Sequence, residues 1–252
     1  MSESLIRWLL LLVCCIALNA QATDTTNYEF GGHLKTRGTV QNFPEDSAIN
    51  ALTGSTAEDL TMELRLMFNA DKGSWDFKTD GQAIVSYGDT VQYTRALADQ
   101  APGFESLFGR LITDDRRWWD LTHTFEDEGK RALIGRLDRL SVGYTGTTAS
   151  VRLGRQAISW GNGLFFTPMD IVNPFDPTQV DTEFKAGDDM LYGQYLRDNG
   201  DDIQTSYVIR RNPETGDVES DQTTLAAKYH GCAGVAEYGV LSAWECGVVV
   251  RA

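Results

Sequence analysis

The strongest constraint on the fold is a regular alternation of apolar and polar residues over long segments. It covers residues 28–41 and 60–69, and after the turn at Asp71-Lys72-Gly73 it continues over residues 75–87. Successive side chains of a strand point to opposite faces. Each segment therefore predicts a β-strand with one apolar and one polar face.

Weaker alternation continues along the chain, in segments separated by turn residues. The best turn signal is Asn199-Gly200, a pair typical of tight hairpins. No helices alternate regularly with the strands, which favours antiparallel pairing, and the pattern predicts an all-β, up-and-down fold of about nine strands. The remaining predicted strands are residues 119–126, 136–144, 150–160, 189–197, 203–211 and 223–229.

Alternation alone does not decide whether the apolar faces point inward or outward to lipid. The long segments exceed the usual globular strand of roughly 5–6 residues and reach the roughly 9–11 of a membrane strand. Trp75 and Tyr87 end one apolar face about 40 Å apart, and a tilt of about 40° projects this to about 30 Å, close to the separation of two aromatic girdles. The polar faces mix both signs of charge, which suits a solvated lumen. These observations favour an antiparallel transmembrane β-barrel, and a soluble periplasmic barrel or sandwich that binds a ligand is the alternative.

The first 22 residues predict a cleaved secretory signal. Arg7 supplies positive charge, residues 8–18 are apolar, and Ala20-Gln21-Ala22 has the small-x-small pattern of a cleavage site. The apolar run is shorter than the roughly 20 residues of a spanning helix, which disfavours an uncleaved anchor. Bulky residues precede Cys14 and Cys15, which disfavours a lipoprotein signal. We therefore expect export and cleavage after Ala22.

Composition excludes some classes of function. The net charge of −14 argues against a nucleic-acid partner, because phosphate backbones select basic surfaces. Cleavage would leave Cys232 and Cys246, which an oxidising compartment would permit to pair, but two cysteines are too few for a disulfide scaffold. No pattern predicts a metal site or a cofactor.

Two segments interrupt the alternation. Residues 89–117 contain four apolar residues at helical spacing, which predicts a short helix over a barrel mouth or an ordinary loop helix: Phe104, Leu107, Phe108 and Leu111. Residues 154–177 are rich in glycine, proline and aromatic residues, which predicts an ordered loop. Folded into the mouth, this loop would narrow a pore; packed on the rim, it would only close a core. Both arrangements fit the sequence.

The second segment resembles the signature of a poorly characterised group of porin-like outer-membrane proteins of Gram-negative bacteria. Their pattern is roughly Gly-Arg-Gln, three residues, Trp-Gly-x-Gly, an aromatic residue, Pro-x-Asp and Asn-Pro-Phe-x-Pro. The matching residues are Gly154, Arg155, Gln156, Trp160, Gly161, Gly163, Phe166, Pro168, Asp170, Asn173, Pro174, Phe175 and Pro177. The nearby Leu137-Asp138-Arg139-Leu140 also fits. The resemblance implies an outer-membrane barrel, in contact with lipid and with the barrel-assembly machinery, and it supplies no substrate.

One departure from this group concerns the C-terminal end. Its members are longer and finish in an amphipathic strand with a terminal aromatic residue, whereas this chain finishes in Arg251-Ala252. We therefore expect a barrel region over residues 23–230, an atypical tail over residues 231–252, and an unclosed N-terminal portion of a larger barrel.

No catalytic pattern stands out. The chain contains no Gly-x-Ser-x-Gly, His-Glu-x-x-His or Cys-x-x-Cys motif. The sequence therefore predicts a passive channel for small hydrophilic solutes rather than an enzyme, with an outer-membrane hydrolase as the alternative. The candidates for lumen-facing residues are Glu29, His33, Lys35, Arg37, Glu63, Arg65, Asp76, Lys78 and Asp80.

Overall fold

A computed structural model describes residues 26–47, 50, 54–100, 112–160, 172–173, 184–233 and 236–245. These residues form one antiparallel sheet of ten strands, which confirms the all-β prediction. The helical elements among them are α3 (Asp89–Gln100) and the short η2 (Ser220–Gln222). The strands are β1 (Asn27–Asn42), β2 (Thr56–Lys72), β3 (Trp75–Gly88), β4 (Thr122–Glu128), β5 (Arg131–Thr145), β6 (Ala149–Gln156), β7 (Asp188–Leu196), β8 (Asp202–Val208), β9 (Thr224–Ala233) and β10 (Ala236–Glu245).

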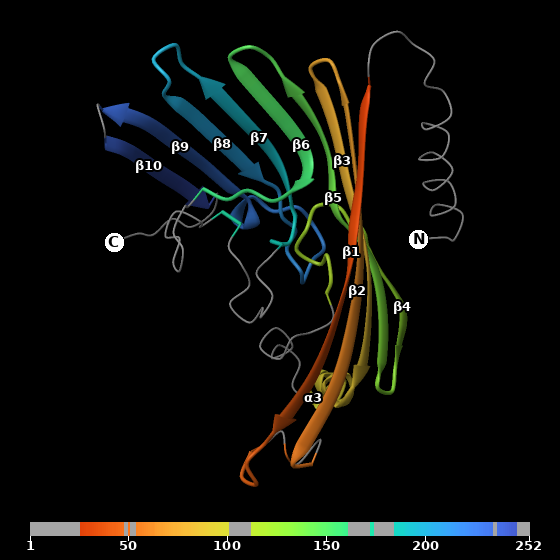
Figure 1. The fold of residues 1–252 in the computed structure, drawn as a ribbon. Helices are drawn as coiled ribbons and strands as arrows, with labels where there is room; N and C mark the ends of the chain where they lie inside the picture. Colours follow the sequence, from red (N-terminus) through yellow and green to blue (C-terminus); the bar gives the residue numbers. More distant parts are fainter. Residues whose placement is uncertain are drawn as a thin grey trace, which may run out of the picture.

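The strands lie in chain order from β1 to β10, with β4 as the one element off the path (Figure 1). β4 and β6 share one edge of β5: β4 pairs with residues 131–136 and β6 with residues 140–145. The order is up-and-down, as predicted. The sheet formed by the described strands is open, with β1 and β10 at its two edges, so it is not closed into a barrel.

Several element boundaries differ from the prediction. β5 begins at Arg131, before the predicted residue 136, and the helix α3 precedes the predicted apolar run, whose residues 104–111 lie outside the described part. The predicted signal, residues 1–22, also lies outside it. β10 lies within residues 231–252, the segment predicted to be an atypical tail. In β10, Leu241 and Ala243 lie on one face and Val240 and Trp244 on the other. Because both faces carry apolar residues, the sequence shows no alternation of apolar and polar residues although a strand forms.

The two faces of the sheet have inverted polarity compared with a water-soluble sheet. Large apolar side chains are exposed, as with Phe30 at 80%, whereas the opposite face buries charge, as with Arg65 at 2%. The strand registers align one continuous apolar row across nine strands of the outer face: Tyr28, Ala70, Phe77, Val142, Leu153, Leu191, Tyr207, Leu225 and Trp244. We call the opposite, polar face the inner face.

Connections at the two ends of the sheet differ in length. Tight turns join β2 to β3, β5 to β6 and β7 to β8 at one end. At the other end lie the long connections 43–55, 89–121, 157–187 and 209–223, with the β4–β5 turn as the one short connection there. Among the described residues, no helix is both long and apolar enough to cross a membrane.

An apolar cluster lies on the inner face of β7, β8 and β9. Met190, Val208 and Ala226 are buried there against Trp160 and Val172 from the β6–β7 connection. This cluster is small, and most of the apolar surface of the sheet is on the outer face. The connection is therefore held against the inner face partly by apolar contacts and partly by the polar contacts described below.

Gly154 in β6 should not tolerate a side chain. Its φ of 131° is a conformation that L residues rarely adopt, and a Cβ would lie 2.2 Å from the Leu140 carbonyl oxygen. We expect Gly154→Ala to lower the free energy of unfolding by about 1–3 kcal/mol from backbone strain alone, measured by urea unfolding followed by tryptophan fluorescence. Gly38→Ala is the matched control, because a Cβ at Gly38 meets no atom within 4 Å. Equal midpoints for the two variants would contradict this account.

Candidate functional site

A β-bulge places one carboxylate at the centre of the inner face. The pairing of β3 with β5 shifts between Asp80 and Gly81, so that Asp80 faces Arg139, Gly81 faces Leu137, and Asp138 has no partner across the ladder. A bulge adds one residue to a strand and redirects its neighbours. Here the bulge directs the consecutive residues Asp138 and Arg139 to the same side of the sheet, so that both side chains lie on the inner face.

Three guanidinium groups surround the Asp138 carboxylate. Arg65 Nη1 lies 3.0 Å from Oδ2, Arg136 Nη2 lies 3.0 Å from Oδ1, and Arg139 Nη1 lies 2.5 Å from Oδ2. The backbone N–H of Gly187 donates to Oδ1 at 3.1 Å. Arg65 also contacts Asp80 Oδ2 at 3.2 Å, which balances part of the positive charge. A carboxylate accepts several such bonds, and charge-assisted bonds are the stronger class. This cluster ties β2, β3 and β5 to the connection before β7.

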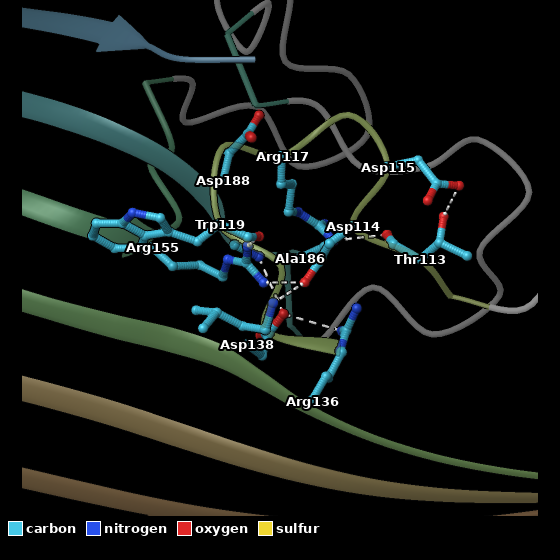
Figure 2. A network of polar contacts seen from close by, with 12 residues as sticks. Thr113, Asp114, Asp115, Arg117, Trp119, Arg136, Asp138, Arg155, Ala186 and Asp188 are labelled. Carbon is cyan, nitrogen blue, oxygen red and sulfur yellow. Dashed lines mark hydrogen bonds and ion pairs between the residues drawn. The ribbon is translucent and has the colours of Figure 1, made fainter. Parts of the chain in front are cut away.

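A second cluster centres on Arg155 at the end of β6 (Figure 2). Its guanidinium forms a fork with Asp189 of β7, with Nε 2.8 Å from Oδ1 and Nη2 3.0 Å from Oδ2. Nη1 donates to Asp114 Oδ2 at 2.7 Å, and Asp114 also binds Arg117 at 2.7 Å. The Arg155, Asp114 and Asp189 side chains are each only 1% exposed. Charges so deeply buried persist only when paired.

Asp114 titrates below an ordinary aspartate. Burial alone would raise the pKa of its carboxyl, but the hydrogen bond and the charge of Arg155, and then those of Arg117, outweigh burial and hold the pKa below its usual range. Asp114 also accepts the backbone N–H of Leu121 at 2.8 Å. The residue therefore fixes the connection between α3 and β4 against the ends of β6 and β7.

The described end of the β6–β7 connection lies on the inner face. Phe184 stacks on His33 with ring centroids 5.1 Å apart and covers the Arg65 guanidinium at 4.5 Å. Lys185 Nζ donates to the Ile158 carbonyl at 3.0 Å. A Cβ at Gly187 would lie 2.1 Å from the Asp138 carbonyl oxygen, so only glycine permits this approach. Residues 184–187 therefore lie on the inner face, whereas residues 161–171 and 174–177, for which the sequence left two arrangements open, lie outside the described part.

The predicted lumen residues lie on the polar face of β1, β2 and β3, opposite the apolar row. The structure brings Arg65 and Asp80 into the first cluster, and Glu63 lies 3.9 Å from Arg65. Asp76 forms an ion pair with Arg152 at 2.9 Å. The others do not join these clusters: His33 and Lys35 contact the Phe184 ring, Lys78 is half-buried on β3, and Glu29 and Arg37 are exposed on β1.

The sequence prediction missed the acidic and basic residues outside the first three strands that complete the clusters. Arg136, Asp138 and Arg139 belong to a strand that the sequence assigned only coarsely, and Asp114 belongs to residues 89–117, a segment for which a short helix was predicted. The motif Leu137-Asp138-Arg139-Leu140 was a usable signal, since it breaks the alternation at the bulge.

The signature residues that the structure describes converge on this region. Besides Gly154 and Arg155, Gln156 donates to the Arg152 and Met190 carbonyls, each at 3.2 Å. Asn173 Nδ2 donates to the Ala186 carbonyl at 3.2 Å, and Trp160 is buried in the apolar cluster. The signature residues outside the described part are Gly161, Gly163, Phe166, Pro168, Asp170, Pro174, Phe175 and Pro177.

Chemically, the two clusters present charges that are already paired. Within residues that the structure describes, no group of three or more His, Cys, Asp or Glu side chains is arranged to hold a metal ion. Comparison with models of protein families, with curated protein sequences and with solved structures gives no match. The resemblance to porin-like proteins therefore stays a prediction from the motif.

Arg155 should be indispensable for stability. Arg155→Met leaves Asp114 and Asp189 buried without their shared cation, and we expect a loss of about 3–5 kcal/mol in the free energy of unfolding, measured by urea unfolding in detergent micelles. Arg37→Met removes an exposed arginine of β1 and should change stability by less than about 1 kcal/mol. A comparable loss in both variants would argue against a special role for Arg155.

The stabilising effect of Asp114 should depend on pH. An aspartate in an unfolded chain titrates near ~3.9. Because the folded pKa is lower, the contribution is complete above that pH and is lost as pH falls through the folded value. The difference in unfolding free energy between the wild type and Asp114→Asn should be constant from about pH 5 to 7 and shrink below about pH 4. Asp115→Asn, which changes an exposed neighbour, is the control. A difference that persists unchanged to about pH 2 would refute the effect.

Proposed function

We propose that the chain forms part of the wall of an outer-membrane channel, porin-like in class, that gives passive passage to small hydrophilic solutes. The observation that carries this proposal is the inverted polarity of the sheet, with an apolar row across nine strands of the outer face, most of it exposed, and charges buried on the other face. In water such an apolar surface is costly to expose. Against lipid it is the expected surface of a transmembrane strand.

The connections support the same orientation. Barrels of the outer membrane have short periplasmic turns and longer extracellular loops. The end of the sheet with the β2–β3, β5–β6 and β7–β8 turns would then be periplasmic, and the end with connections 89–121, 157–187 and 209–223 extracellular. Tyr144 and Trp75 contact each other near the turn end, and Tyr87 lies at the far end of β3, which suits two interfacial belts.

The inner face supports a lined, narrowed passage. Phe184 and the segment before β7 lie on this face beside His33 and Arg65, where they would reduce the open cross-section of a closed barrel. The backbone groups at the edges β1 and β10 would be unpaired in lipid, which is prohibitively costly. A channel therefore requires each edge to pair with further strands, from the same protein or from another copy.

The proposal is tested by cell fractionation and by conductance. We expect the protein to remain in the outer membrane after a high-salt wash, to show heat-modifiable gel mobility, and to conduct ions in planar bilayers. Phe184→Ala should raise single-channel conductance, because it removes a ring from the inner face. Asp80→Asn should shift ion preference toward anions, because it uncovers the charge of Arg65.

The matched control is Phe30→Ala, the same substitution on the exposed outer face of β1, which should leave conductance unchanged. Release of the protein by salt alone would favour the soluble alternative. Retention in the membrane without any conductance would refute the channel.

A further inference from the structure

A polar pocket of about 330 Å³ lies on the inner face at the turn end of the sheet. Two neighbouring rows of the strand register form its floor. One row runs from Asp76 through Gly143 and Arg152 to Tyr192, and the other from Ser150 through Gln194 to Gln204. These rows lie apart from the two charge clusters, and the volume is within the range of roughly 300–1,000 Å³ typical of small-molecule sites.

The roof of the pocket is the segment that follows β6. Residues 157–160 line the pocket, and the Trp160 carbonyl accepts a bond from Lys228 Nζ of β9 at 2.9 Å. Gln156 anchors the start of this segment on the Arg152 and Met190 carbonyls. The roof is therefore fixed at both ends over β6 to β9.

The lining carries one positive and one negative side chain, and these are paired. Arg152 Nη2 lies 2.9 Å from Asp76 Oδ2. Gly143 stands between them in the register, and a Cβ there would lie 2.3 Å from Asp76 Oδ1. Because Gly143 has no side chain, Asp76 reaches across β5 to Arg152. The pocket is therefore neutral overall, and a charged ligand would have to compete with this ion pair.

The lining also has hydrogen-bonding capacity that protein atoms do not use. The indole Nε1 of Trp160, a side chain only 4% exposed, and Nε of Arg152 are buried without a hydrogen-bond partner. Gln194 and Gln204 donate through Nε2 to Asp202 Oδ2, at 3.2 and 2.6 Å. A buried polar atom left unpaired is costly, and in native proteins it calls for water or a ligand.

We propose that this pocket binds a neutral polyhydroxylated solute, a mono- or disaccharide or a polyol. A hydroxyl group both donates and accepts, so it satisfies the indole and guanidinium N–H groups and the amide oxygens together. The half-buried Tyr192 ring offers apolar surface to the C–H face of a sugar ring. As the solute class of the channel, the saccharide rests on the proposed function, whereas binding to the pocket does not require conduction.

The test is equilibrium dialysis of the full chain in detergent micelles with radiolabelled maltose. We expect saturable binding with a dissociation constant of about 1 mM or tighter. Tyr192→Phe removes a hydroxyl and keeps the ring, Trp160→Phe removes the indole N–H and keeps an aromatic side chain, and each should weaken binding about 3- to 10-fold. Tyr195→Phe, on the outer face of the same strand and 51% exposed, is the matched control and should bind as the wild type does.

Competition identifies the chemical class. Sorbitol should displace maltose better than gluconate or glucosamine, which carry similar hydroxyls plus one charge. Stronger displacement by gluconate or by the zwitterion glycylglycine, equal affinities of the Tyr192→Phe and Tyr195→Phe variants, or no maltose binding at about 50 mM would overturn the proposal. Maltose binding without conductance would refute the channel and support the saccharide site. Conductance without maltose binding would refute the saccharide site and support the channel.

Discussion

The fork between Arg155 and Asp189, extended to Asp114, is the contact on which the arrangement of the connections depends. It joins β6, β7 and the segment between α3 and β4 at a point where no backbone ladder joins all three. Ion pairs on a surface contribute little, but a guanidinium enclosed with two carboxylates is different, because its removal takes away the cation that both buried carboxylates share. Two further contacts complete the cluster: Arg117 forms a second ion pair with Asp114, and the backbone N–H of Trp119 donates a hydrogen bond to Asp189.

The cluster around Asp138 holds the long strands β2, β3 and β5 together in the same way, through buried ion pairs. The bulge supplies the carboxylate, and Gly187 supplies the close approach of a second segment. The result is a face whose charges are arranged by backbone geometry. Arg65 shows this well: its guanidinium contacts Asp138 and Asp80 on one side and lies against the Phe184 ring on the other.

Local pattern was sufficient to predict β1 and β3 almost to the residue, because each strand exposes one apolar and one polar face without interruption. It was insufficient at β5, where the bulge at Asp138 shifts the alternation by one position, and at β10, where small and apolar residues occupy both faces. The lumen candidates were assigned from strand faces, which sequence reveals. Their partners, such as Asp138 for Arg65 or Arg152 for Asp76, come from other strands, and pairing register is set by the whole sheet.

The shared edge of β5 has a consequence for how the sheet comes apart. Between residues 137 and 140 neither β4 nor β6 pairs with β5, so the ladder on that side is interrupted. One part, β1 to β5, and the other, β6 to β10, are then joined by the β5–β6 ladder over residues 140–145 and by buried side chains. An interrupted ladder favours separate opening of its two sides, so amide hydrogen exchange should report different opening free energies for β1 to β5 and for β6 to β10.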